Sequence, residues 1–209
     1  MKAVRTRAVA VARTLITTLG LFSLSLGSVG AFAQAGNAHI STTSAQQTPT
    51  PAQSELLRIV RESTERFQNI SVAQGEGYQL LFGCVSGSDS GAMGLHFVKQ
   101  AFLAAPPLTA NGEIDPTRPE IVIYEPVRGG GLRLIGADYL LFADAWDKTH
   151  PGNPPQLFGQ LFHYFESPNR FGLPAFYTLH VWAWKENPNG AFVNWHPNVS
   201  CQLFSGQTP

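Results

Sequence analysis

Three polar side chains, His96, Glu125 and His180, stand inside otherwise apolar segments of the chain. Alternate side chains of an extended strand share one face, so each of the three would project to one side of a sheet. If those faces converge, two imidazoles and a carboxylate meet in an apolar enclosure. Such groups are ligands of divalent zinc, copper or iron, and three protein ligands leave a position open for water or substrate. The residue types therefore indicate a metal site.

The spacing of these residues leaves other interpretations open. No short ligand motif such as H-x-H or H-E-x-x-H occurs. Buried histidines commonly satisfy their ring nitrogens with a backbone carbonyl or a carboxylate instead of a metal. A hydrogen-bonded polar cluster and three unrelated strand positions are thus the alternatives. Glu120 lies too close to Glu125 to be identified as an acid–base partner, and Asp138 with Tyr139 fits ordinary strand positions.

Aromatic residues near His180 suggest a ligand pocket. Such pockets are mainly apolar with a few polar anchors, and Trp182 and Trp184 would share a strand face with His180. We expect these two indoles, Tyr124 and His163 to contact a small molecule. The same aromatic residues could instead fill the core. Other rings that could line the pocket are Phe82, Phe97, Phe158 and Phe162.

Other catalytic chemistries are less well supported. The segment GSDSG at 87–91 resembles the serine loop of trypsin-like proteases, but only His39 precedes it, whereas those enzymes place His and Asp upstream. The glycines at 129–131 lack the Lys-Ser/Thr and helix start of a phosphate-binding loop. In a metal-dependent enzyme the ion would polarise a substrate or acidify a water, with Tyr139 or His163 as proton carrier. No residue pattern identifies a substrate.

A mainly antiparallel sheet is predicted to position these residues. Short apolar runs separated by Gly, Pro, Asn and Asp are typical of strands and turns. The segments 126–131 and 187–190 predict two hairpins, and strands joined by short loops pair antiparallel. The predicted strands are Tyr78–Phe82, Leu95–Val98, Glu120–Glu125, Leu132–Phe142, Phe176–Trp184 and Ala191–Trp195.

A helix is predicted ahead of the strands, from Pro51 to Gln68. Thr50 has the character of an N-cap, Pro51 would occupy the first helical position, and Gln53 could complete a capping box. Apolar residues recur on one face of this helix, which should pack on the sheet and carry no chemistry. The predicted fold class is α+β, with a partly closed barrel as one form of the sheet.

Residues 1–33 have the pattern of an export signal. A basic start is followed by an apolar run from Leu15 to Val29 and by Ala31-Phe32-Ala33. We expect cleavage before Gln34, a flexible spacer at 34–49 and a single domain at 50–209. The apolar run is shorter than the roughly 18 clean residues of a spanning helix. The mature protein should therefore be periplasmic or extracellular without a stable membrane span, and a retained anchor is the alternative.

Charge argues against a nucleic-acid partner. Removal of the leader, which holds four of the 14 basic residues, would leave 10 basic against 14 acidic residues and a net charge of −4. Nucleic-acid-binding proteins need a basic stripe to neutralise phosphates. The low charged fraction, 13%, together with many Gly, Pro and aromatic residues, is expected of a loop-rich exported domain.

Only two cysteines occur, Cys84 and Cys201. In an exported chain thiols meet oxidants and usually pair, so we predict a disulfide between them. A metal thiolate and a catalytic cysteine are the alternatives. The bridge would tie the early part of the domain to its end and close a long loop.

Several short motifs occur together in this chain. They are GAMGLHFV at 91–98, DP at 115–116, RPE at 118–120, YEP at 124–126, LHVWAW at 179–184, NPNG at 187–190, and the two cysteines. Together they resemble a family of secreted bacterial proteins of unknown function, over roughly Asn69 to Cys201. The resemblance implies that His96, Glu125 and His180 belong to the family pattern, and it supports export from a bacterium. His196 is a departure, since the pattern has Asn after the Trp.

Three functions remain in competition. The leading interpretation is an exported, disulfide-closed domain that binds a small molecule or a metal in an aromatic-lined pocket. A metal-dependent enzyme is the second, and the third is an envelope structural or interaction module that presents Pro-rich loops such as 151–155. A pocket without metal would favour ligand binding, whereas a stoichiometric metal with an open position would favour catalysis. The absence of a concave cavity would favour the interaction module.

Overall fold

A computed structural model describes residues 48–87 and 89–206. The expected export signal, nearly all of the expected spacer, and Ser88 of the GSDSG segment lie outside the described residues. Within the described part, no helix has the length and apolar character needed to cross a membrane.

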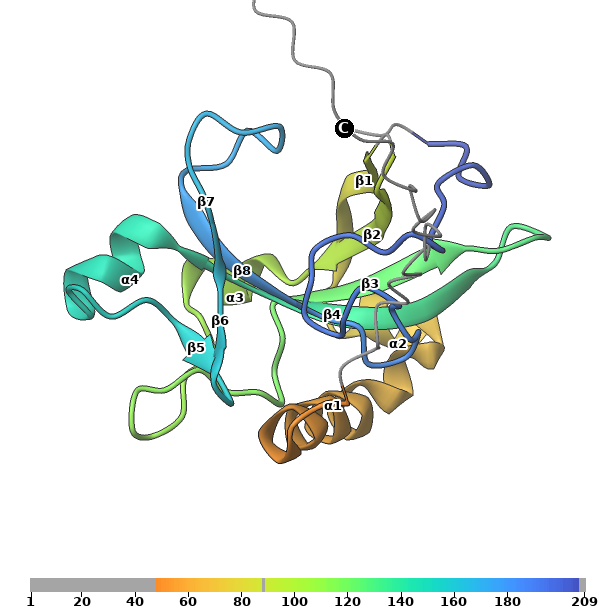
Figure 1. Cartoon of the computed structure of the whole chain (residues 1–209). Helices are drawn as coiled ribbons and strands as arrows, with labels where there is room; N and C mark the ends of the chain where they lie inside the picture. Colours follow the sequence, from red (N-terminus) through yellow and green to blue (C-terminus); the bar gives the residue numbers. More distant parts are fainter. Residues whose placement is uncertain (1–47, 88, 207–209) are drawn as a thin grey trace, which may run out of the picture. The chain divides into compact units, whose positions relative to one another are not determined.

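The centre of the fold is a six-stranded antiparallel sheet that curls into a half-barrel (Figure 1). Its strand order is β1-β2-β3-β4-β8-β7, and β5 and β6 form a separate pair. The predicted α+β class with a mainly antiparallel sheet is therefore confirmed. The strands are β1 (Gln79–Gly87), β2 (Gly91–Val98), β3 (Ile121–Pro126), β4 (Leu132–Phe142), β5 (Gln156–Leu157), β6 (Gln160–Leu161), β7 (His163–Phe165) and β8 (Phe176–Val181).

Helix α1 (Pro51–Thr64) begins at the predicted residue. The Thr50 side chain accepts a hydrogen bond from the Gln53 N–H, the Gln53 side chain accepts one from the Thr50 N–H, and Pro51 occupies the first turn. A 3₁₀ turn extends the helix to Gln68. The other helices are α2 (Ile70–Gly75), α3 (Gln100–Ala104) and α4 (Ala143–Thr149).

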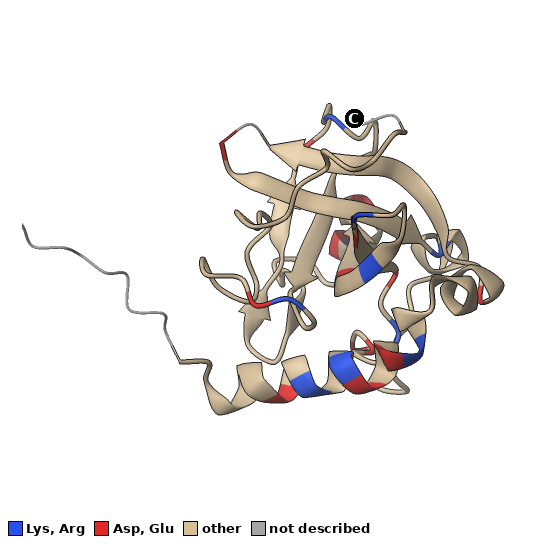
Figure 2. Ribbon diagram, turned by 90° about the vertical axis from the view of Figure 1, so that its right-hand side faces the viewer, with Lys and Arg blue, Asp and Glu red and all other residues tan. Residues whose placement is uncertain are grey.

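The sheet separates two apolar layers. On one face, Leu56 and Val60 of α1 pack with Tyr139 and Leu179. The outer side of α1 carries both acidic and basic residues (Figure 2). The other face is covered by residues between β7 and β8 and by the C-terminal segment. That second layer includes Val98, Ile121, Ile123, Leu140, Phe176 and Val199, with Phe82, Phe165 and Phe171 packed against it.

Two parts of the predicted sheet differ from the structure. Strand β8 ends at Val181, and the predicted strand Ala191–Trp195 consists of turns and bends. The indole N–H of Trp182 donates to the Val193 carbonyl at 2.6 Å, so this loop folds against the end of β8 without forming a strand. Conversely, the sheet edge is completed by β7, which is three residues long and too short to show a periodic pattern.

Glycine is required at two close contacts between neighbouring strands. Gly94 has φ +94°, and a Cβ at this position would lie 2.6 Å from the Tyr124 carbonyl oxygen. A Cβ at Gly136 would lie 2.5 Å from the Val181 carbonyl oxygen. The register between β3 and β4 also shifts between Ile123 and Tyr124. Such bulges bend a strand and increase its twist, which helps the sheet to curl.

The predicted disulfide is confirmed. Cys84 on β1 is bonded to Cys201, with the two Cα atoms 5.7 Å apart and 117 positions apart in sequence. The bridge fastens the C-terminal segment to one edge strand of the sheet. Among the described residues there is no free cysteine, so the thiolate alternatives do not hold there.

The double variant Cys84→Ala/Cys201→Ala should have a lower free energy of unfolding. Opening a loop of this length costs up to about 5 kcal/mol by the chain-entropy model, and 2 to 4 kcal/mol is typical for disulfides. Urea denaturation of the oxidised wild type, the reduced wild type and the variant measures the difference. Coincident midpoints for the three samples would show that the bridge does not constrain the chain.

Candidate metal centre

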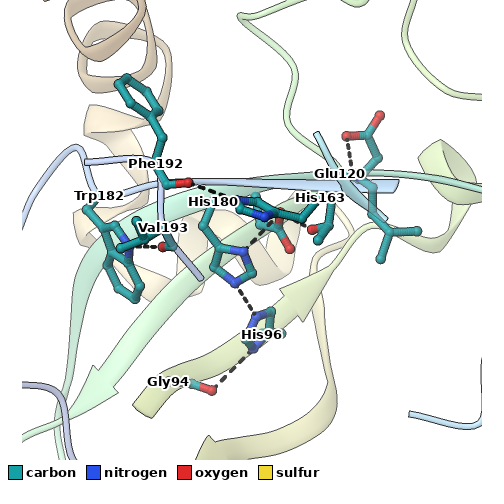
Figure 3. Close-up of polar contacts among 11 residues, drawn as sticks. Gly94, His96, Glu120, His163, His180, Trp182, Phe192 and Val193 are labelled. Atoms are coloured by element: carbon teal, nitrogen blue, oxygen red, sulfur yellow. Dashed lines mark hydrogen bonds and ion pairs between the residues drawn. The ribbon is translucent and has the colours of Figure 1, made fainter. Parts of the chain in front are cut away.

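His96, Asp138 and His180 meet on one face of the curled sheet. They project from β2, β4 and β8. Strands β3 and β4 lie between β2 and β8, so the backbones of β2 and β8 would be roughly 14 Å apart in a flat sheet. In the curled sheet the two side chains meet, and His96 Nε2 lies 3.3 Å from His180 Nε2 (Figure 3). One ligand atom from each of the three residues lies within 4.8 Å of the others.

Each imidazole faces an acceptor through its Nδ1 atom. His96 Nδ1 lies 3.2 Å from the Gly94 carbonyl oxygen (Figure 3). His180 Nδ1 lies 3.6 Å from Asp138 Oδ1, too far for a hydrogen bond, and the Asn194 side chain lies near the same imidazole. The same Asp138 oxygen accepts the Thr178 hydroxyl at 2.5 Å. His96, Asp138, Thr178 and His180 are each at most 4% exposed, so the cluster is shielded from bulk solvent.

Burial determines the protonation of the cluster. It lowers the pKa of His96 to about 4, with a further lowering by His180, and lowers the pKa of His180 to about 3. It raises the pKa of Asp138 to about 6, against the opposing effects of His96 and the Thr178 hydroxyl. Near pH 7 the two imidazoles are therefore neutral and the Asp138 carboxylate is ionised.

Hydrogen placement leaves a ring nitrogen of the cluster able to bind a cation. The Gly94 carbonyl can only accept, so the single N–H of neutral His96 belongs on Nδ1. His96 Nε2 then carries a lone pair that faces His180 Nε2 at 3.3 Å. Either the N–H of a neutral His180 or a metal ion between the two Nε2 atoms can satisfy this lone pair. The cluster is therefore compatible with metal binding.

A small cavity of about 20 Å³ adjoins the cluster. That volume has room for about one water-sized molecule. His96, Asp138, Thr178 and His180 form its polar part. The remaining lining residues are apolar: Phe82, Met93, Ile121, Leu140, Phe165, Phe171, Leu173 and Phe176.

No protein-family model, curated protein or solved structure matches this chain. The resemblance of its motifs to secreted bacterial proteins therefore stays a prediction, and the site is interpreted from its own geometry.

Glu125 does not accompany the two histidines as expected. Ile123, and not Glu125, pairs with His96 across β2 and β3. Glu125 lies further along β3, where it forms ion pairs with Arg133 and Lys185, the latter at 2.6 Å. Its carboxylate is thus already neutralised, and Asp138 supplies the acid beside the imidazoles.

Trp182, Trp184, Tyr124 and His163, the predicted ligand-binding residues, do not line the cavity. Tyr124 belongs to the opposite sheet face, where its hydroxyl donates to the Phe67 carbonyl at 2.7 Å. The Trp184 indole donates to the Thr64 hydroxyl at 2.9 Å. The ring centroids of Trp182 and His180 are 6.0 Å apart, so this indole packs beside the cluster.

The remaining candidates have equally definite positions. His163 is exposed, and its Nε2 atom lies 3.3 Å from the Phe192 carbonyl oxygen (Figure 3). The hydroxyl of Tyr139, an expected proton carrier, donates to the Pro116 carbonyl at 2.6 Å on the opposite face. Phe158 lines a separate open hollow of about 750 Å³ near α4. Phe97 and Phe162 pack in the core layers.

Asp138 is the site residue that the sequence reasoning missed. It lies in the middle of an eleven-residue apolar strand, with Ala137 and Tyr139 as neighbours. Aspartate is almost never fully buried unless it has a partner. An acid at the centre of an apolar strand therefore indicates a buried carboxylate with a partner, and this pattern could have identified Asp138.

A second buried acid, Glu120, has no part in the cavity lining. Its Oε2 atom accepts the Leu140 N–H at 3.2 Å, while Oε1 has no partner. Burial raises the pKa of Glu120 to about 8. The carboxyl therefore keeps its proton in the folded state at pH values at which it is ionised in the unfolded state.

The folded protein should lose stability as pH rises from about 4.5 to about 8 because of Glu120. Its raised pKa favours unfolding over this window by up to about 4 kcal/mol. Glu120→Gln should remove most of that pH dependence. The measurement is the free energy of urea unfolding at several pH values, with Glu65→Gln, an exposed glutamate, as the control. Parallel pH profiles for wild type and Glu120→Gln would contradict the assignment.

Proposed function

We propose that this protein is an exported, disulfide-closed domain that binds one divalent metal ion through His96, Asp138 and His180. The observation that carries the proposal is the pair of facing Nε2 atoms at 3.3 Å. Two nitrogens bound to one zinc ion at 2.0 to 2.1 Å with tetrahedral angles are about 3.3 Å apart. The two imidazole nitrogens therefore have the separation of ligands in a metal complex.

The carboxylate fits this assignment in charge and in position. Asp138 adds one negative charge to a site of two neutral imidazoles, which makes it attractive for a divalent cation. Asp138 Oδ1 lies 3.6 Å from His180 Nδ1, so the negative charge is close to the imidazoles. Three protein ligands leave an open coordination position, and the cavity lined by the same three residues is where it would point.

Three observations support export to an oxidising compartment. They are the leader pattern at 1–33, the resemblance to secreted bacterial proteins, and the Cys84–Cys201 disulfide. The metal would therefore be acquired by a folded or folding domain outside the cytoplasm. Bound metal would supply Lewis acidity or, for a redox-active ion, a position for a small ligand.

Metal analysis with matched variants tests the proposal. Wild-type protein refolded with zinc, copper or iron and then desalted should retain about one equivalent of one of these metals. His96→Gln, His180→Gln and Asp138→Asn should each weaken binding by tenfold or more, because each removes a ligand. Elemental analysis by mass spectrometry measures the metal.

The controls separate this site from the alternatives. His163→Gln removes a nearby exposed imidazole and should retain the metal. Glu125→Gln removes the acid originally expected as a ligand and should also retain it, provided circular dichroism shows a folded chain. Less than about 0.1 equivalent in the wild type, or loss of metal in Glu125→Gln with retention in Asp138→Asn, would refute the proposed site.

A further inference from the structure

We propose that the site binds ferrous iron and that its open position takes a neutral diatomic gas, of the class of dioxygen or nitric oxide. The inference rests on the proposed metal site and specifies its ion and its ligand. Two imidazoles and one carboxylate with open positions form the donor set of the non-haem iron(II) centres that react with oxygen. In this chain His96, His180 and Asp138 supply that set.

The size of the cavity limits the ligand. Pockets for organic molecules typically enclose 300 to 1,000 Å³, whereas this cavity has about 20 Å³. It touches all three candidate ligands, so a molecule inside it lies next to the ion. A molecule of one or two heavy atoms fits, and a sugar, peptide or nucleotide does not.

The lining of the cavity favours a gas over water. The phenyl rings of Phe82, Phe165, Phe171 and Phe176 offer no hydrogen bond, and the Thr178 hydroxyl is occupied by Asp138. A water inside the cavity finds polar partners only at the cluster and lacks most of those it has in bulk. Neutral diatomic molecules lose little on leaving water, so the same walls admit them.

Packed rings define the walls. The rings of Phe165 and Phe176 stack with centroids 5.0 Å apart, and those of Phe82 and Phe171 meet edge to face at 5.4 Å. Phe171 lies in the connection between β7 and β8, which the Asn169 side chain holds by hydrogen bonds to the backbone at 166, 171 and 173. The wall of the cavity is therefore built from packed rings and a hydrogen-bonded connection.

Nitric oxide is the probe for this inference. Protein loaded with one equivalent of Fe(II) without oxygen should give the spin-3/2 electron paramagnetic resonance signal of a ferrous nitrosyl on exposure to the gas. Leu173→Trp places a larger side chain at the wall of the cavity, where it should fill the space beside the ion. This variant should retain iron and have an at least tenfold lower affinity for nitric oxide. Leu161→Trp is the control, since Leu161 is 61% exposed and does not line the cavity.

A second variant tests the size limit from the opposite direction. Phe171→Ala should enlarge the cavity, so that added imidazole shifts the Co(II) absorption spectrum of the cobalt-loaded variant but not that of the wild type. Iron bound without a nitrosyl signal, retention of zinc or copper alone, or imidazole binding to the wild type would each overturn this inference and leave the metal site standing. Failure to retain any metal would overturn both proposals.

Discussion

The approach of two imidazole nitrogens inside an apolar sheet is the constraint on which the rest of the site depends. His96 turns its Nδ1 toward the Gly94 carbonyl, and its Nε2 atom lies 3.3 Å from His180 Nε2. The low dielectric of a buried site strengthens good polar contacts and also raises the cost of a missing one. Either an N–H of His180 or the proposed metal ion satisfies the lone pair of His96 Nε2.

The fold maintains that approach through its backbone. His96 and His180 come from strands that are not neighbours, so their contact requires a curled sheet. The bulge between β3 and β4 and the close strand contacts at Gly94 and Gly136 are compatible with that curl. Apolar layers on both faces then resist flattening, because flattening would expose buried side chains. The geometry of the site is thus a property of the whole sheet.

Local signals in the sequence were sufficient for much of the fold. The capping box at Thr50, the apolar alternation of the main strands and the pairing of two cysteines depend on near neighbours or on compartment, and all three are found. The candidate site was harder to predict. Alternation places the Glu125 side chain on one face of its strand, but it does not say which residue of a neighbouring strand lies opposite. Register decides partners: it places Ile123 opposite His96 and Asp138 opposite His180. The predicted strand Ala191–Trp195 was wrong because a long-range contact decides its structure: this segment folds as a loop and bonds to the Trp182 indole after β8.

The environment of the cluster joins folding to ligand choice. Metal binding is linked to stability whenever the unfolded chain lacks the assembled ligands, and the candidate ligands come from three separate strands. The apolar rings that bury the cluster also form the cavity wall beside it. The packing that would strengthen the contacts of the proposed ion would therefore also restrict what that ion could bind.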